Sequence, residues 1–298
     1  MSVCLIVIFN HRYDSNLEKL DKLYRNRFNN IYYLVPFYNG TREDVVPVYE
    51  SSYQFQGYLA QSYDKIANKK YSHYLIIGDD LILNPALNED NILDKFGMDN
   101  GDAFIESLTP LNKTYYWYRE RFIDADRAFK QDGTSYKDEI PSKEEAQKLA
   151  QAYGFNDFSL NHLKYTKVPI KRLHAKIKDL IYRFTLPIRL DYPLVTGYSD
   201  FIILPNDIYK EFCRLSGTFA AMRLFVEISI PTAIMFTVSK DHLKTSTNVN
   251  LKTPKLWWIT DTVKEFSKQC DYRIYSMTDY WPEEYAYLHP IKLSKWKE

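Results

Sequence analysis

At residues 74–83 the chain reads Tyr74-Leu75-Ile76-Ile77-Gly78-Asp79-Asp80-Leu81-Ile82-Leu83. A short apolar run bounded by glycine and acids predicts a buried strand that presents two carboxylates at its carboxyl end. Open α/β sheets bind ligands at that end of their strands. Adjacent carboxylates repel each other unless water or a cation neutralises them, and a divalent cation that also contacts phosphate is a common neutraliser. The pair therefore indicates a metal and nucleotide-diphosphate site, although Asp-Asp after a strand also occurs as a plain turn or helix cap.

The first hundred residues alternate strand and helix patterns around this stretch. Apolar runs at 3–9 and 31–35 predict strands, and leucines and aromatics at helical spacing between residues 17 and 28 and between 58 and 66 predict helices. This succession predicts an α/β fold with a mostly parallel central sheet flanked by helices. The chain has only 9 glycines and lacks both G-x-G-x-x-G and G-x-x-x-x-G-K-[ST], which excludes the dehydrogenase and P-loop classes.

Composition sets the remaining limits. With 298 residues, 45% of them hydrophobic, the chain can form one large domain or one domain with a sizeable insertion. A total of 39 Lys and Arg against 38 Asp and Glu argues against a protein that binds nucleic acid through its overall charge. The three cysteines are widely separated and lack metal-ligand spacing, which fits a reducing cytosol.

Neither of the two long apolar stretches in the sequence indicates insertion into a membrane. The apolar start, 1–9, lacks a basic flank and a small-residue cleavage site, so it predicts a strand and not a signal peptide. The apolar stretch 228–238 contains Pro231 and is well short of the roughly 20 residues that span a bilayer. We therefore expect a cytoplasmic protein.

The segment 109–193 differs from its surroundings and is expected to be a mainly helical insertion. Ser142-Lys143-Glu144-Glu145 is a capping box that predicts a helix ending near Gly154. A second, amphipathic helix is predicted at 170–184, within a stretch from His162 to Leu190 that holds eight Lys or Arg and one acid, Asp179. This basic helix could contact the inner face of an anionic membrane or a lipid-linked pyrophosphate acceptor, or it could simply pack on the core with a solvated basic face.

Two acidic residues in the last third of the chain stand beside predicted elements of the core. Asp200 follows Gly197-Tyr198-Ser199 and precedes a predicted strand at 201–204. Glu227 is the single acid in the apolar run 222–236, where an isolated buried ion would be prohibitive. Glu227 is thus either a general-base candidate or a helix-end carboxylate paired with Arg223.

The tail supplies the last candidates, His289 and Lys292. A neutral imidazole can ligate a divalent metal, and a lysine can meet a diphosphate oxygen. By itself this segment is also typical of an ordinary polar terminus.

Together these pieces resemble glycosyltransferases of the GT-A fold, especially bacterial enzymes of O-antigen and capsule biosynthesis. The resemblance covers most of the chain outside the insertion and places Asp79-Asp80 at the family's Asp-x-Asp metal motif. It implies a nucleotide-sugar half at 1–108, an insertion at 109–193 that contacts acceptor or membrane, and an acceptor half with a returning tail at 194–298. The implied residue roles are donor binding by Asn10, His11, Asp79 and Lys292, metal binding by Asp79, Asp80 and His289, and catalysis by Glu227 or Asp200.

The resemblance implies a Mn²⁺- or Mg²⁺-assisted transfer of a sugar from a nucleotide-diphosphate sugar to a glycan or lipid-linked glycan. The motif reads Asp79-Asp80-Leu81, so its last acid is missing and the metal-binding carboxylate stays open. Inversion is favoured slightly over retention. The alternatives are a non-catalytic nucleotide- or sugar-binding protein on the same scaffold and a sugar nucleotidyltransferase. The latter would normally carry a glycine-rich loop where this chain has Asn10-His11-Arg12.

Overall fold

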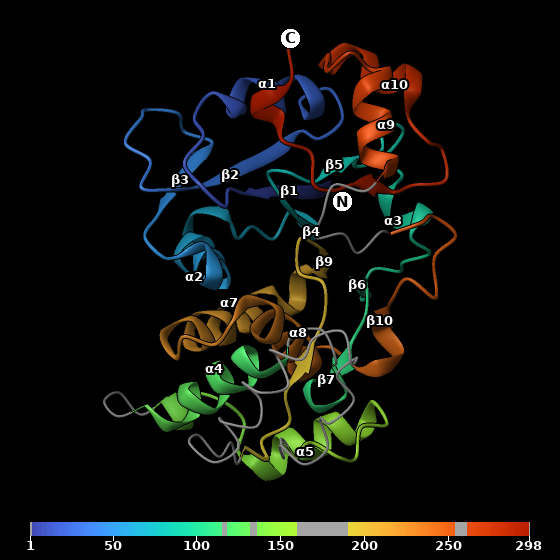
Figure 1. The fold of residues 1–298 in the computed structure, drawn as a ribbon. Helices are drawn as coiled ribbons and strands as arrows, with labels where there is room; N and C mark the ends of the chain where they lie inside the picture. Colours follow the sequence, from blue (N-terminus) through green and yellow to red (C-terminus); the bar gives the residue numbers. More distant parts are fainter. Residues whose placement is uncertain (1, 115–117, 132–135, 160–189, 254–260, 298) are drawn as a thin grey trace, which may run out of the picture.

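The computed structural model describes residues 2–114, 118–131, 136–159, 190–253 and 261–297. At its centre lies a seven-stranded sheet with the order β10-β6-β9-β4-β1-β2-β3 (Figure 1). The strands of this sheet are β1 (Ser2–Ile8), β2 (Asn30–Pro36), β3 (Val45–Val48), β4 (Tyr71–Gly78), β6 (Ala103–Ile105), β9 (Phe201–Pro205) and β10 (Leu243–Lys244). All neighbours pair in parallel except β9, which is antiparallel to both β4 and β6.

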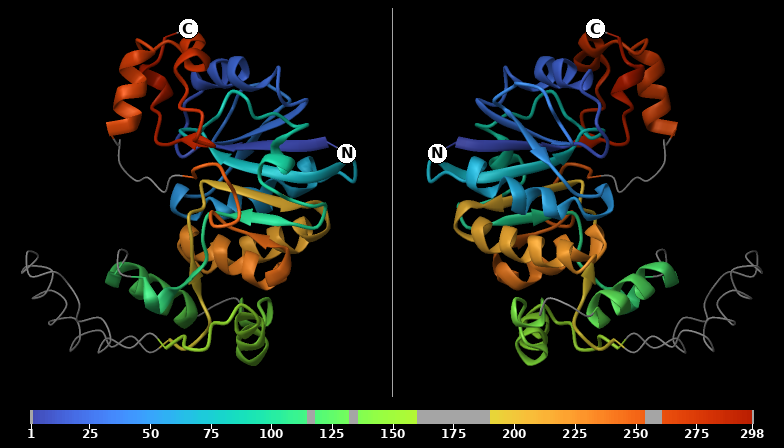
Figure 2. Two further views of the ribbon diagram at one scale, coloured as in Figure 1. Left: turned by 90° about the vertical axis from the view of Figure 1, so that its right-hand side faces the viewer. Right: turned by 90° about the vertical axis from the view of Figure 1, so that its left-hand side faces the viewer.

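Helices cover both faces of this sheet (Figures 1 and 2). One face carries α2 (Gln56–Ile66), α7 (Asn206–Ala221) and α8 (Val226–Thr237), and the other carries α1 (Asn16–Tyr24), α9 (Asp261–Gln269) and α10 (Met277–Tyr280). Along β4, Tyr74 and Ile76 pack into the hydrophobic core on the side of α2, α7 and α8. Leu75 and Ile77 pack into the core on the side of α1, α9 and α10. A central strand buried on both faces needs this continuous apolar run. The predicted mostly parallel α/β sheet flanked by helices is confirmed.

The segment 109–193 adds structure on the far side of α7 and α8. Figures 1 and 2 show α4 (Tyr118–Lys130) and α5 (Lys143–Ala152) there, away from the sheet. The predicted capping box of α5 is confirmed: Ser142 accepts from the Glu145 amide, and Glu145 accepts from the Ser142 amide. The predicted basic helix at 170–184 lies outside the described residues. Within the described part of the chain, no helix has both the length and the apolarity to cross a bilayer.

The remaining elements are short. They are β5 (Ile82–Leu83), β7 (Thr109–Pro110), β8 (Val195–Thr196), β11 (Tyr287–Leu288), α3 (Ile92–Lys95) and the 3-10 turns η1 (Ser52–Gln54), η2 (Leu111–Lys113), η3 (Tyr136–Asp138), η5 (Lys240–His242), η6 (Ile274–Ser276) and η7 (Leu293–Lys295).

Backbone hydrogen bonds bring two distant segments to the carboxyl end of β4. The Gly78 amide donates to the Asp200 carbonyl at 3.0 Å, because β9 runs antiparallel to β4 and begins where β4 ends. The tail pairs β11 with β5, and the Ile291 amide donates to the Asp80 carbonyl at 2.7 Å. Farther along, the Lys19 ammonium of α1 donates to the Leu293 and Trp296 carbonyls and holds the end of the tail.

The turn before β9 requires a glycine. A Cβ on Gly197 would lie 2.2 Å from the Ser107 carbonyl oxygen, a backbone atom that cannot move aside cheaply. Gly197 thus lets Tyr198 and Asp200 approach the sheet edge.

Candidate active site at the carboxyl end of β4

Asp79 lies at the inner end of the site. Its side chain is buried, its amide donates to the Ile8 carbonyl, and its Oδ1 accepts from the Asn10 amide at 3.2 Å. The carboxylate therefore fixes the start of the loop after β1 against the end of β4. Parallel neighbours place their carboxyl ends at one sheet edge, which is why residues far apart in sequence meet here.

Asp80 faces the returning tail. Its Oδ1 lies 3.4 Å from His289 Nε2, and it is buried without a hydrogen-bond donor among the described residues. The His289 ring also contacts the Tyr198 ring edge-on, with centroids 5.7 Å apart. The structure thus brings Asp80 and His289 together from positions more than two hundred residues apart in the sequence.

Asp200 completes an acidic cluster with these two aspartates. A methyl group on Gly78 would lie 3.2 Å from Asp80 Oδ1 and 3.7 Å from Asp200 Oδ1, so both carboxylates crowd the same small space. The neighbouring Tyr198 hydroxyl is buried and has no hydrogen-bond partner among the described residues. An oxygen acceptor or a water would satisfy it, which marks this space as polar.

Burial and charge crowding raise the pKa values of the clustered aspartates. Burial, and then the charge of Asp80, raises the pKa of Asp79 to about 8. Burial also raises the pKa of Asp200 to about 6, while His289 counteracts this and Asp80 adds to it. The folded, metal-free protein therefore favours the protonated form of Asp79 near neutral pH, and a cation bound at this edge would favour the ionised form.

Glu227 lies in the first turn of α8 and is half-buried. Burial and the charge of Asp200 raise its pKa well above the usual range, and the Arg121 guanidinium of α4 opposes the shift. Among the described residues, Arg223 pairs instead with Glu50, with Nη1 and Oε1 2.6 Å apart. The alternative interpretation of Glu227 as the partner of Arg223 is therefore wrong.

Two residues predicted to bind the sugar donor, His11 and Lys292, have exposed side chains. His11 packs edge-on against Tyr13, with ring centroids 5.9 Å apart. Lys292 follows His289 on the tail. Within the described ranges, neither side chain makes a hydrogen bond or ion pair, so both are available to a ligand.

The donor set suits a divalent cation that also takes ligands from a substrate. Among the described residues, no three His, Cys, Asp or Glu side chains form a ready metal cage. Magnesium and similar ions need none, since they bind through one or two carboxylates together with water and substrate phosphates. Asp80 Oδ1, which lacks a hydrogen-bond donor among the described residues, and the neighbouring His289 imidazole supply such a partial set.

Sequence patterns did not reveal two further residues of this region. Tyr198 is a candidate only once β9 is known to start beside Gly78. Arg121 belongs to α4, and nothing in its own segment indicates that α4 reaches the start of α8. The Arg121 guanidinium stacks on Phe225, 3.6 Å from the ring centroid.

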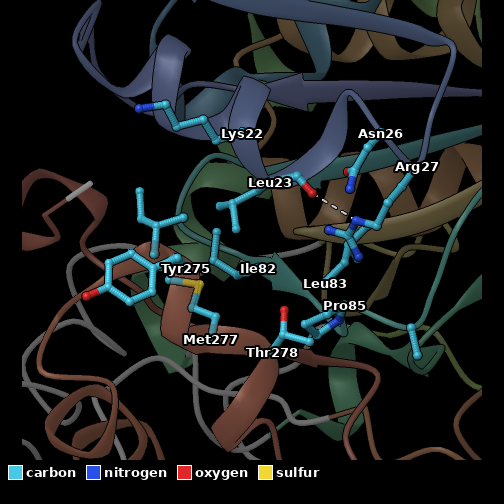
Figure 3. A pocket seen from close by; sticks show the side chains of 12 residues that line it. Lys22, Leu23, Asn26, Arg27, Ile82, Leu83, Pro85, Tyr275, Met277 and Thr278 are labelled. Carbon is cyan, nitrogen blue, oxygen red and sulfur yellow. Dashed lines mark hydrogen bonds between the residues drawn. The ribbon is translucent and has the colours of Figure 1, made fainter.

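A separate cavity of about 650 Å³ lies between the end of α1, β5 and α10 (Figure 3). Its walls are mainly apolar, and none of the predicted site residues lines it. Arg27 at its wall donates to the Leu23, Asn84 and Leu87 carbonyls. The guanidinium is therefore occupied in joining α1 to the segment after β5.

Comparison with known proteins yields one structural likeness. The chain resembles core-mannan synthase A (CmsA/Ktr4) of Aspergillus fumigatus, whose crystal structure is of the Mn/GDP form, at 12% identity and a TM-score of 0.37 over 84% of this chain and 73% of that one. No protein-family model matches the sequence. No curated protein matches it either.

The raised pKa of Asp79 makes a prediction about stability. In the unfolded chain this carboxyl loses its proton near pH 4, and in the folded chain near pH 8, so the folded state binds the extra proton in between and stability falls as pH rises. Asp79→Asn keeps the acceptor for the Asn10 amide and removes the charge. In chelator-treated protein we expect the variant's melting temperature to exceed wild type by about 2 °C or more at pH 8, the shift that roughly 1 kcal/mol produces in a large domain, with a smaller gain at pH 5.

Asp14→Asn is the matched control. The guanidinium of Arg12 lowers the pKa of Asp14, so removing this exposed carboxylate should not stabilise the protein at pH 8. If the melting temperatures of wild type and Asp79→Asn instead differ by the same amount at every pH from 5 to 8, the electrostatic explanation of the cluster is wrong.

Proposed function

We propose that this protein is a GT-A-like glycosyltransferase that transfers a sugar from a nucleotide-diphosphate sugar to a hydroxyl of a glycan acceptor. The observation that carries the proposal is the convergence of Asp79, Asp80, Asp200 and His289 at the carboxyl end of β4. Three segments of the chain supply these groups, and an acidic cluster at that edge suits a cation bound to a diphosphate.

Donor binding is assigned to the loop after β1 and to the tail. Asn10, held by its amide on Asp79, and the exposed His11 border the position expected for the nucleoside. Asp80 and His289 would hold a divalent cation, with Asp79 behind them, and the exposed Lys292 can reach a diphosphate oxygen as a point charge. When bound, Mn²⁺ or Mg²⁺ would offset the negative charge that develops on the leaving nucleoside diphosphate.

Glu227 is the proposed general base. A carboxylate with a raised pKa accepts a proton more readily near neutral pH, and a proton must leave the acceptor hydroxyl as the new glycosidic bond forms. The Arg121 guanidinium opposes this rise in the pKa. Asp200, also with a raised pKa, is the second candidate. This arrangement fits an inverting reaction, in which the acceptor attacks the donor directly.

The finer assignment is to cell-surface polysaccharide biosynthesis, such as O-antigen or capsule, at the inner face of the cytoplasmic membrane. Its support is the sequence alone: eight Lys or Arg against one acid between His162 and Leu190 would favour an anionic membrane or a lipid-linked acceptor. No nucleic-acid partner is proposed, because the overall charge is nearly balanced.

The metal assignment is tested by ligand-induced stabilisation. UDP or GDP with Mn²⁺ should raise the melting temperature of wild type, since a ligand present at a hundred times its Kd stabilises the native state by about 2.7 kcal/mol. Asp80→Asn should abolish the Mn²⁺-dependent part of this shift. Asp90→Asn, an exposed carboxylate on the loop after β5, is the control and should keep it. An unchanged shift in Asp80→Asn would exclude Asp80 as a metal ligand.

The proposed base is tested by separating binding from turnover. Glu227→Gln should keep the nucleotide-induced melting shift but lower transfer to acceptor by about a hundredfold or more, the scale of general-base assistance. The activity assay follows a screen of nucleotide sugars for hydrolysis with and without Mn²⁺. A fully active Glu227→Gln would transfer the role to Asp200 or indicate a retaining reaction.

A further inference from the structure

The edge of the sheet that carries the acidic cluster also carries exposed aromatic rings. The described residues include seven large hydrophobic side chains with high exposure, and four of them follow the carboxyl ends of β1, β2 and β3: Tyr13, Phe37, Tyr49 and Tyr53. Phe37, Tyr49 and Tyr53 expose 60%, 63% and 61% of their surface, and the Phe37 and Tyr49 rings meet edge-on at 5.8 Å. Clustered exposed rings mark binding surfaces, unlike apolar residues scattered singly.

Tyr53 connects these rings to the proposed base. Its ring lies 6.3 Å from that of Phe225, the residue at the N-cap of α8 and two positions before Glu227. The Arg121 guanidinium covers Phe225 at 3.6 Å and lies 5.9 Å from the Tyr53 ring, and the same cation opposes the rise in the pKa of Glu227 that burial causes. The aromatic surface therefore joins the site on the side of Glu227, whereas Asp80 and His289 lie on the side of the tail.

Hydrogen-bonding groups accompany the rings. Glu50, which lies between Tyr49 and Tyr53 in the sequence, pairs with the exposed Arg223 guanidinium just before α8. Near Phe37, the Asn39 side chain accepts from Arg12. Aromatic faces flanked by carboxylate, guanidinium and amide groups match a sugar ring, whose C–H face packs on the electron-rich face of an aromatic ring while its hydroxyls form hydrogen bonds at the edge.

We infer that Tyr53 and Tyr49, together with the Glu50–Arg223 ion pair, form a binding track for the pyranose rings of an oligosaccharide acceptor. The track leads from the end of β3 past Phe225 to Glu227. The inference rests on the proposed function in assigning the Glu227 side to the acceptor. Binding of sugar to the track requires neither catalysis nor metal.

The test measures oligosaccharide binding directly, by ligand-observed NMR saturation transfer and titration. The probes are maltohexaose, cellohexaose, chitohexaose and mannohexaose. Wild type should bind at least one, and Tyr49→Ala and Tyr53→Ala should each weaken it by about threefold to tenfold, the scale of one aromatic contact. Tyr53→Phe, which keeps the ring, should retain most of the affinity.

Tyr275→Ala is the matched control, since Tyr275 is 64% exposed but lies on η6 beside the cavity of Figure 3. It should bind the oligosaccharide like wild type. Melting temperatures of all variants, measured without ligand, identify any loss of binding that comes from unfolding.

Each other outcome overturns either this inference or the proposed function. If wild type binds none of the four oligosaccharides but responds to UDP or GDP with Mn²⁺, the track is wrong and the proposed function stands. If Tyr49→Ala or Tyr53→Ala weakens nucleotide binding and leaves oligosaccharide binding intact, the rings hold a nucleobase and the track is again wrong. Oligosaccharide binding by wild type without any nucleotide response would keep the track and overturn the proposed transfer reaction.

Discussion

The crowding of three carboxylates where β4 ends is the constraint on which the rest of the site depends. Backbone bonds impose it: the Gly78 amide holds the Asp200 carbonyl, and the Ile291 amide holds the Asp80 carbonyl. Asp79 is fixed by its bond from the Asn10 amide. These contacts keep the aspartates at least partly buried and close together, so burial first, and then the charge of Asp80, raise the pKa values of Asp79 and Asp200. Holding three carboxylates this close together is electrostatically unfavourable, and a cationic ligand bound at this edge would offset that cost.

The fold separates two chemical environments on either side of this cluster. On one side the tail supplies His289 and the exposed Lys292, which suit a cation and a diphosphate. On the other side α8 supplies Glu227, with Arg121 and Phe225 beside it and exposed rings beyond. A transfer reaction needs this division, because the leaving group requires positive charge while the attacking hydroxyl requires a proton acceptor.

The sequence was informative where a local pattern determines the structure. The apolar runs of β1 and β4 must be buried on both faces, and the capping box at Ser142 satisfies its own helix end, so these elements follow from residues close together in the chain. The position of Asp79 and Asp80 directly after a buried strand could be predicted because a strand end is itself a local feature. Contacts between distant segments were harder to predict. No local pattern shows that Arg223 would choose Glu50 over Glu227, since that choice depends on where β3 ends relative to the turn between α7 and α8. Arg121 and Tyr198 were missed for the same reason, and the exposed rings after β2 and β3 became a surface only once the order of the sheet was known.

The central claim is that the carboxyl end of β4 binds a divalent cation together with a nucleoside diphosphate. Anomalous diffraction at the manganese edge, from crystals grown with Mn²⁺ and UDP or GDP, tests it most directly. We expect a manganese peak between the Asp80 carboxylate and the His289 imidazole, with diphosphate oxygens completing its coordination. A nucleotide bound without manganese at that edge, or bound in the cavity beside Arg27, would contradict it.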